Sequence, residues 1–177
     1  PYCSFHKFRF DEPSARAYFE LLHQEMRMVY ALGYRFDSIY FGGGTTTILP
    51  RELGDTIDLA KSLFAIREVS CESDPAHLGD LDAAYLEGKI DRLSIGIQSF
   101  NDETLKQIGR YKKFGSAQEQ YAKAELAIGR FPIVNIDMIY NYPDQSEEDL
   151  HREIDTILRL RPPQATFYPL MYAPGIR

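Results

Sequence analysis

The sequence has little cysteine and no long apolar run. Its two cysteines, Cys3 and Cys71, are too few for a disulfide framework, which indicates a reducing compartment. No apolar run approaches the roughly 18 residues of a membrane span, and no signal peptide is evident, so we expect a cytoplasmic protein without a membrane span. The four histidines show no ligand spacing, and we assign none of them to a metal.

Positive charge is also in the minority. Lysine and arginine number 20 against 26 aspartates and glutamates, which gives a net charge of −6, and the basic residues are scattered along the chain. This argues against a nucleic-acid surface and favours small or neutral partners. Tryptophan is absent, whereas 12 tyrosines and 11 phenylalanines predict either an aromatic-rich core or an aromatic-lined cavity. With 177 residues, 44% of them hydrophobic, the chain is long enough for one domain with one core.

Strand and helix patterns alternate along the chain. Short apolar runs predict strands at 38–41, 68–72, 92–99, 134–140 and 165–171. Helical spacing and capping residues predict helices at 12–33, 50–64, 81–87, 101–108, 116–128 and 146–160. The apolar stripe of the first helix is expected to be core, and it consists of Tyr18, Leu21, Leu22, Met26, Val29 and Tyr30. The alternation predicts parallel βαβ units, and therefore either a (β/α) barrel, whole or partial, or an open doubly wound sheet.

Polar residues follow several of these strands. A turn of three glycines and three threonines comes directly after the strand at 38–41, and a buried strand that ends in glycines permits close approach of a ligand to the backbone. Such a turn can hold a phosphate, a carboxylate or an amine, or it can be a simple connecting loop. Glu72, Gln98, and Asp137 with Asn141 occupy corresponding positions in later units. In both architectures the carboxyl ends of the strands carry the ligand site, so we expect a shared site there.

Five segments together are specific for one family. They are YCSF (2–5), YFGGGT (40–45), ESDP (72–75), RLSIGIQSF (92–100) and NIDMIY (135–140). This set resembles the radical S-adenosylmethionine enzymes, and within them the oxygen-independent coproporphyrinogen III oxidase group, which also contains haem chaperones and anaerobic haem-degrading methyltransferases. The resemblance covers nearly the whole chain. It implies an α/β fold, a partial (β/α)6 barrel of the radical SAM type with about five βα units present.

The resemblance also implies the cofactors and partners. Members of this group hold a 4Fe-4S cluster and S-adenosylmethionine at the open end of the barrel, where the cluster reduces the sulfonium and releases a 5′-deoxyadenosyl radical. The implied substrate is a tetrapyrrole, a porphyrinogen or haem, and the implied electron donor is a flavodoxin or ferredoxin. Oxidative decarboxylation of coproporphyrinogen is the expected reaction. The alternatives are a haem-binding chaperone or an anaerobic haem-degrading methyltransferase.

The family motifs assign individual residues. Cys3 matches the last cysteine of the CxxxCxxC loop, and thiolates suit iron because both are soft. The matching cofactor-binding positions are Tyr2, Gly42, Gly43, Gly44, Thr45, Glu72, Gln98, Arg110 and Asp137. Within this set the glycine segment matches main-chain contacts to the methionine moiety, Glu72 and Arg110 lie near its amino-acid part, and Gln98 and Asp137 match contacts to the ribose hydroxyls. No catalytic residue is assigned.

Simpler roles remain open for some of these residues. Arg110 is alternatively a solvated arginine at a helix end, and Gln98 and Asp137 alternatively cap the helices that follow them. Cys71 is expected to be a small buried hydrophobe.

Two departures from the family pattern affect the expected function. The first two cluster cysteines and the first strand of the family are missing before Pro1, so we expect residues 1–177 to be a radical SAM core domain that is truncated at its N-terminus and lacks a C-terminal substrate domain. Asn141-Tyr142-Pro143 stands where the porphyrinogen oxidase more often has Gly-Leu-Pro, and FYPLM (167–171) is similar to the haem-degrading and chaperone branches. The exact reaction is therefore open.

Overall fold

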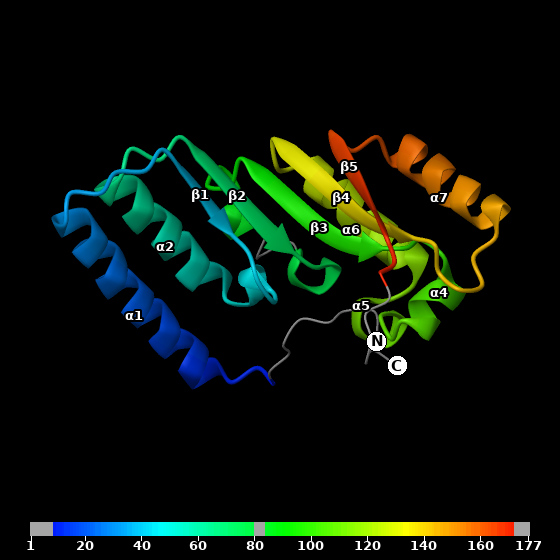
Figure 1. Ribbon diagram of the computed structural model, residues 1–177, viewed down its shortest axis with the longest axis horizontal. Coiled ribbons are helices and arrows are strands. Elements are labelled where there is room, and N and C mark those ends of the chain that lie inside the picture. Colours follow the sequence, from blue (N-terminus) through cyan, green and yellow to red (C-terminus); the bar gives the residue numbers. More distant parts are fainter. Residues whose placement is uncertain (1–8, 80–83, 172–177) are drawn as a thin grey trace.

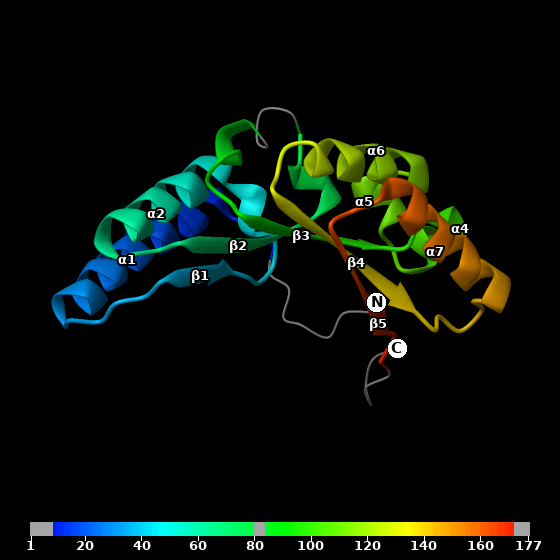
Figure 2. The same cartoon turned by 90° about the horizontal axis from the view of Figure 1, so that it is seen from above.

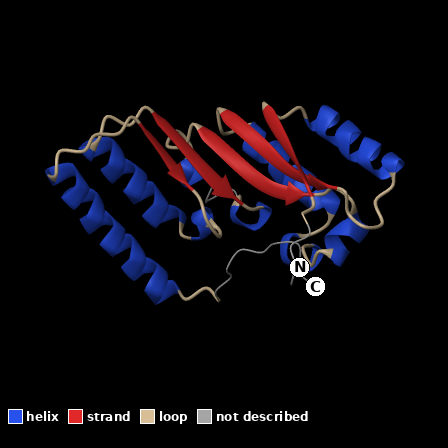
Figure 3. Ribbon diagram, in the orientation of Figure 1, coloured by secondary structure: helices blue, strands red, loops and turns tan. Residues whose placement is uncertain are grey.

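The fold is a five-stranded parallel sheet with helices between the strands (Figures 1 and 3). The computed structural model describes residues 9–79 and 84–171. The elements are α1 (Glu12–Ala31), β1 (Ser38–Phe41), η1 (Thr46–Ile48), α2 (Pro50–Leu63), β2 (Glu68–Ser73), η2 (Pro75–His77), β3 (Arg92–Gln98), α4 (Asp102–Gln107), α5 (Tyr111–Phe114), α6 (Ala117–Ile128), β4 (Ile133–Tyr140), α7 (Glu147–Leu160) and β5 (Gln164–Pro169).

The strand order distinguishes between the two predicted architectures. The strands pair in the order β1-β2-β3-β4-β5, and every pair is parallel. A doubly wound sheet reverses its strand order and carries helices on both faces. Here the order follows the sequence, the sheet is arched, and α2, α6 and α7 lie on its convex side (Figure 2). The fold is therefore the partial-barrel type of α/β protein, as the family resemblance implies.

Polar caps begin the helices where the sequence predicts them. The side chains of Asp11, Asn101, Ser116 and Ser146 accept hydrogen bonds from backbone N–H groups in the first turns of α1, α4, α6 and α7. Ser116 and Ser146 each form a capping box with the acidic residue three positions later. Asn101 is the N-cap of α4, and its side chain accepts from the N–H groups of Glu103 and Thr104.

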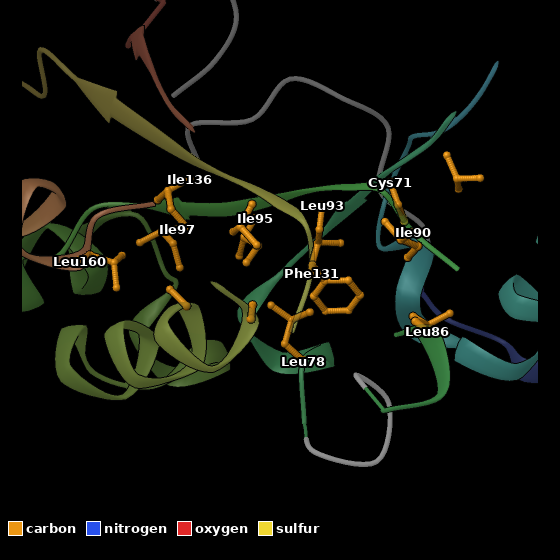
Figure 4. Packing of buried hydrophobic residues seen from close by; sticks show 14 of the residues in the cluster. Cys71, Leu78, Leu86, Ile90, Leu93, Ile95, Ile97, Phe131, Ile136 and Leu160 are labelled. Atoms are coloured by element: carbon orange, nitrogen blue, oxygen red, sulfur yellow. The ribbon is translucent and has the colours of Figure 1, made fainter. Parts of the chain in front are cut away.

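Alternate side chains of the strands build the core on the convex side. Cys71 of β2, Ile95 of β3 and Ile136 of β4 are all fully buried there, against residues such as Leu78 and Leu160 (Figure 4). Successive strand residues point to opposite faces, so the intervening residues face the concave side. The prediction that Cys71 is a buried small hydrophobe is confirmed.

One packing prediction was wrong in part, and other predictions fall outside the described residues. Of the predicted core stripe of α1, Met26 is buried and Leu22 and Val29 are partly buried, whereas Tyr18 and Leu21 are 61% and 63% exposed and Tyr30 is also exposed. The reason is that α1 packs mainly on α2, so only the side around Met26 is covered. The helix predicted at 81–87 is seen as helical at 84–86, and its first residues lie outside the described part. Tyr2 and Cys3 also lie outside it.

Candidate functional site

The concave face of the sheet is polar. Period-two alternation places these residues on the side opposite the core: Tyr40, Ser70, Glu72, Arg92, Ser94, Gln98, Asn135, Asp137, Gln164 and Thr166. The strands are parallel, so the residues at their carboxyl ends share one edge of the sheet. The sequence predicts the ligand site at this edge.

The glycine turn after β1 has an open backbone. Gly43 has a φ of +128°, which only glycine adopts readily, and a Cβ atom added to Gly43 or Gly44 would meet no heavy atom within 4 Å. Gly42 serves a different purpose, because a Cβ atom there would lie 2.9 Å from Cε1 of Tyr40. The absence of side chains therefore leaves space beside Gly43 and Gly44 and lets the Tyr40 ring cross Gly42.

Glu72 joins this turn to β2. Its Oε1 accepts a hydrogen bond from the Tyr40 hydroxyl at 2.6 Å, and its Oε2 accepts one from the Gly43 N–H at 3.2 Å. Burial of the phenol, together with the hydrogen bond to the Glu72 carboxylate, raises the pKa of Tyr40 to about 12. Both carboxylate oxygens of Glu72 are thus held in place, and each keeps a further lone pair for a cationic or hydroxyl ligand.

The three threonine hydroxyls fasten the other side of the turn. Thr45 Oγ1 donates to Asp74 Oδ2 at 2.8 Å, and Thr47 Oγ1 lies 2.6 Å from Ser73 Oγ. Thr46 hydrogen-bonds the backbone carbonyl of Glu72. Because its hydroxyl is already committed to Asp74, Thr45 can offer a ligand chiefly its main-chain atoms.

Asp74 is the anchor for this part of the loop. It accepts from the Ala76 N–H at 2.9 Å, and its Oδ1 lies 2.7 Å from His77 Nδ1. Burial raises the pKa of Asp74, but the hydrogen bonds from His77 and Thr45 lower it more, so the net pKa is below its ordinary value. Asp74 is therefore ionised at neutral pH and holds Thr45 in position.

Gln98 ends β3 in a left-handed conformation. Its φ is +76°, and the pairing of β3 with β4 shifts register between Gly96 and Gln98. The Gln98 side chain folds back over Gly96, since its Nε2 lies 2.8 Å from where a Cβ atom on Gly96 would stand. Gln98 does not cap α4, because Asn101 does. The simpler capping role is therefore excluded for Gln98.

Arg110 is buried beside the same strand end. Its side chain donates to the carbonyl of Gly96 and lies over the Phe114 ring, with Cζ 4.1 Å from the ring centroid. Only 7% of the residue is exposed. The alternative of a solvated arginine at a helix end was wrong. The structure places Arg110 next to Gly96 and Gln98, although α5, which it precedes, was not predicted.

Asp137 receives a network of hydrogen bonds on the concave face. Its Oδ2 accepts from the Ser94 hydroxyl and its Oδ1 from Asn135 Nδ2, both at 2.8 Å. Asn135 Nδ2 also donates to Ser94 Oγ at 2.8 Å, and Thr166 Oγ1 donates to Asn135 Oδ1 at 2.9 Å. The Asp137 carboxylate is the acceptor at which this chain of hydrogen bonds ends. The helix after β4 is capped by Ser146, so Asp137 does not cap it.

The charges of the site are coupled. Burial raises the pKa of Asp137, the hydrogen bonds from Ser94 and Asn135 partly offset this, and the negative charge of Glu72 raises it further. Glu72 of β2 and Asp137 of β4 thus lie within electrostatic reach of each other. Predicted site residues from β2, β3 and β4 therefore meet on one face with the glycine turn.

Several neighbours of these residues were not predicted as site residues. Ser94 and Asn135 lie two residues before Gly96 and Asp137, so strand alternation alone predicts that they share the concave face. Tyr40 lies two residues before Gly42, so strand alternation also predicts that it shares the concave face. The sequence marks Asp74 only as a member of the ESDP segment. Its hydrogen bond with Thr45 joins residues that are 29 positions apart, so the local sequence does not predict it.

The described residues contain neither a metal-binding cluster nor a membrane-spanning helix. The ranges 9–79 and 84–171 contain no group of three or more histidine, cysteine or acidic side chains that could hold a metal ion. No helix within those ranges is both long and apolar enough to cross a membrane.

Comparison with known proteins identifies the family. The Radical SAM superfamily matches residues 1–157. The chain belongs to the radical SAM superfamily. Within it the chain falls in the group of oxygen-independent coproporphyrinogen III oxidases and heme chaperones.

Three relatives show the extent of the likeness. The heme chaperone HemW of Escherichia coli is 31% identical over 99% of this chain and 48% of its own length. The oxygen-independent coproporphyrinogen III oxidase of Paracoccus denitrificans is 31% identical over 93% of this chain and 38% of its own length. The structure of coproporphyrinogen III oxidase (HemN) from E. coli superposes with a TM-score of 0.84 at 25% identity, over 98% of this chain and 41% of that one. The chain thus spans less than half the length of these relatives.

Proposed function

We propose that residues 1–177 form a radical SAM core domain that binds S-adenosylmethionine along the carboxyl edge of its sheet. The observation that carries this proposal is the convergence of an open glycine backbone, Glu72, Gln98 and Asp137 on one concave face. Backbone N–H and C=O groups suit the methionine part, a carboxylate suits its amino group, and acceptor oxygens suit the ribose hydroxyls.

The described residues fit S-adenosylmethionine better than they fit a cluster. The backbone at Gly43 and Gly44 faces open space, because a Cβ atom at either residue would meet no heavy atom within 4 Å, so a ligand can approach the main chain closely. Cys71, the cysteine of the described part, is buried in the core with its pKa raised to about 11 by burial, so it is unsuited to ligating iron. The cluster ligand that we propose is Cys3, together with two thiolates supplied by a complete CxxxCxxC loop, and Tyr2 lies beside it in the sequence.

In this proposal each part of the chain has a role in binding. Glu72 orients the amino group of the methionine, the turn from Gly42 to Thr45 contacts it through main-chain atoms, and Arg110 lies near the carboxylate. Gln98 and Asp137 receive the ribose hydroxyls. When bound, the 4Fe-4S cluster and S-adenosylmethionine supply a 5′-deoxyadenosyl radical.

We further propose that the substrate is a tetrapyrrole. The likeness to coproporphyrinogen III oxidases supports oxidative decarboxylation of a porphyrinogen. A flavodoxin or ferredoxin would donate the electron that reduces the cluster, and a separate electron acceptor would take the electron that the substrate loses when CO2 leaves. The likeness to proteins named heme chaperone HemW supports the second candidate, a haem-binding chaperone. Both candidates use the same cofactor face, so the substrate separates them.

The experiment uses an extended version of the chain that carries a complete three-cysteine loop, reconstituted with iron and sulfide without oxygen. We expect it to bind about four irons and to cleave S-adenosylmethionine to 5′-deoxyadenosine when dithionite is added. The 177-residue chain alone, which offers a single loop cysteine, is the control and is expected to do neither. Full iron loading and cleavage by the control would contradict the Cys3 assignment.

The second part of the experiment separates the two candidates, and it uses a chain extended at both ends so that it also carries the expected C-terminal substrate domain. Coproporphyrinogen III is added anaerobically and its products are measured by mass spectrometry, and haem is titrated in parallel with the absorbance of the bound form as the readout. Loss of carboxyl groups supports the oxidase. Stable haem binding without decarboxylation supports the chaperone, and failure of both contradicts the tetrapyrrole proposal.

A further inference from the structure

The left-handed turn at Gln98 is an unusual way to end a strand. A non-glycine residue with a positive φ is uncommon, and here it coincides with a register shift and with a side chain folded over Gly96. Such a conformation persists only when its surroundings hold it. The question is which residue does so.

Glu153 of α7 binds the two residues that follow Gln98. Its Oε1 accepts from the Ser99 hydroxyl, and its Oε2 accepts from the Phe100 N–H at 2.8 Å. Ser99 Oγ in turn accepts from the Asn101 N–H at 3.0 Å, which continues the contact to the N-cap of α4. Glu153 is 54 residues away from Ser99 in the sequence, so this is a tertiary contact and not a local turn motif.

A carboxylate at position 153 is energetically unfavourable unless it is hydrogen-bonded, because the position is buried. Glu153 is 5% exposed, and an ionised group removed from water is unfavourable unless donors compensate for the loss. Ile157 and Leu160 already attach α7 to the core, so an apolar residue at 153 would serve for packing alone. What the polar side chain provides beyond packing is hydrogen bonds to Ser99 and Phe100.

We propose that Glu153 is a positioning residue that holds the Gln98 turn in its ligand-binding conformation. The inference rests on the proposed function, in which Gln98 contacts the ribose of S-adenosylmethionine. Glu153 itself does not reach the concave face, because its partners lie beyond the end of β3. It acts through the backbone of residues 98–100. The position of α7 therefore affects how tightly the site binds its ligand.

The test compares four variants of the extended chain: Glu153→Met, Glu153→Gln, Gln98→Ala and the double variant Glu153→Met with Gln98→Ala. The control is Ile157→Val, which loosens the same helix through the core. Binding of S-adenosylhomocysteine is measured by calorimetry, and hydrogen exchange of the Phe100 amide is measured by NMR on the ligand-free protein. Melting temperatures identify any general loss of stability.

We expect Glu153→Met to weaken binding by about tenfold and to raise the exchange rate of the Phe100 amide by at least about tenfold. Glu153→Gln, which can still accept from Phe100 and donate to Ser99 Oγ, should recover most of both. Ile157→Val should leave binding within about twofold of the unaltered protein even if its melting temperature falls. Because Glu153 acts through Gln98, Glu153→Met should weaken binding no further in the Gln98→Ala background.

The outcomes separate this inference from the function on which it rests. Faster exchange at Phe100 with unchanged affinity would overturn the positioning role, because the contact would then be structural only. Additive losses in the double variant would also overturn it. If the unaltered extended chain does not bind S-adenosylhomocysteine at all, the proposed function fails, and the positioning role fails with it.

Discussion

Replacement of Asp137 by alanine removes the acceptor at which the concave-face network ends. Ser94 and Asn135, which donate to it at 2.8 Å, are themselves 5% and 1% exposed. A buried donor left without an acceptor costs about 1–3 kcal/mol. Loss of the buried charge returns part of this, since burial raises the pKa of Asp137. We therefore expect the free energy of unfolding to fall by about 1–3 kcal/mol rather than by twice that amount.

Ligand binding should fall independently of stability. If the ribose hydroxyls donate to Asp137, Asp137→Ala leaves them unpaired and weakens binding by about 1–3 kcal/mol, or roughly 5- to 150-fold. The assay is calorimetry of S-adenosylhomocysteine with the extended chain, beside urea unfolding of the same samples. Gln164→Ala is the matched control, because Gln164 lies on the same face but at the amino end of β5, where it accepts from Arg92 at 3.1 Å.

The dependence on pH gives a second check of Asp137. A carboxyl group whose folded pKa is raised above its ordinary 3.8 binds a proton more readily in the folded state. Its contribution to stability is therefore present below pH 3.8 and is lost as the pH rises through the folded pKa. Asp137→Asn should remove this dependence. Unchanged affinity in Asp137→Ala would refute the ribose assignment, and unchanged stability would refute the network.

Three further predictions test neighbouring features. Gly43→Val should abolish S-adenosylhomocysteine binding with the melting temperature largely retained, because a β-branched residue opposes the φ of +128° and fills the open space; normal binding by this variant would mean that the glycines are only a loop. Cys71, fully buried with a pKa raised to about 11, should resist iodoacetamide at pH 8 until the chain is unfolded, and rapid labelling of the native chain would contradict its burial. Tyr40, whose pKa is raised to about 12 by burial and by Glu72, should still be protonated at pH 11 by NMR of its ring carbon, and Glu72→Gln should lower its pKa; an unaltered titration would show that Glu72 does not hold the phenol.

Most of the fold was predictable because its signals are local. Strand and helix patterns, the Ser116 and Ser146 capping boxes and the alternation of units each depend on a few neighbouring residues. The choice between a barrel and a doubly wound sheet was not local, since it depends on which strands pair, and only the strand order resolved it. Part of the predicted core stripe of α1 was wrong for a related reason. Periodicity shows that Tyr18 and Leu21 share a helix face, but not that another layer covers them.

The candidate site was predictable in position but not in its contacts. Parallel strands must bring their carboxyl ends together, so the glycine turn, Glu72, Gln98 and Asp137 were expected at one edge. The contact of Glu153 with Ser99 spans 54 residues and has no signal in the local sequence. Arg110 was predicted as a ligand residue, and its bond to the Gly96 carbonyl appears only in three dimensions. Its role toward the cofactor stays a prediction.

The two faces of β3 and β4 separate stability from binding. Leu93, Ile95 and Ile136 lie in the core, where removal of methylene groups destabilises by about 0.8 kcal/mol or more for each group. Ser94 and Asp137 lie on the opposite face and are joined by a hydrogen bond. Such a bond contributes about 1 kcal/mol net to stability, and its main effect here is to orient the two side chains. A substitution on the concave face therefore acts on the site directly, and it costs about 1–3 kcal/mol of stability where a buried donor such as Asn135 loses its acceptor. A change in ligand or substrate is then a change of alternate residues on the same strands, with the core positions between them kept.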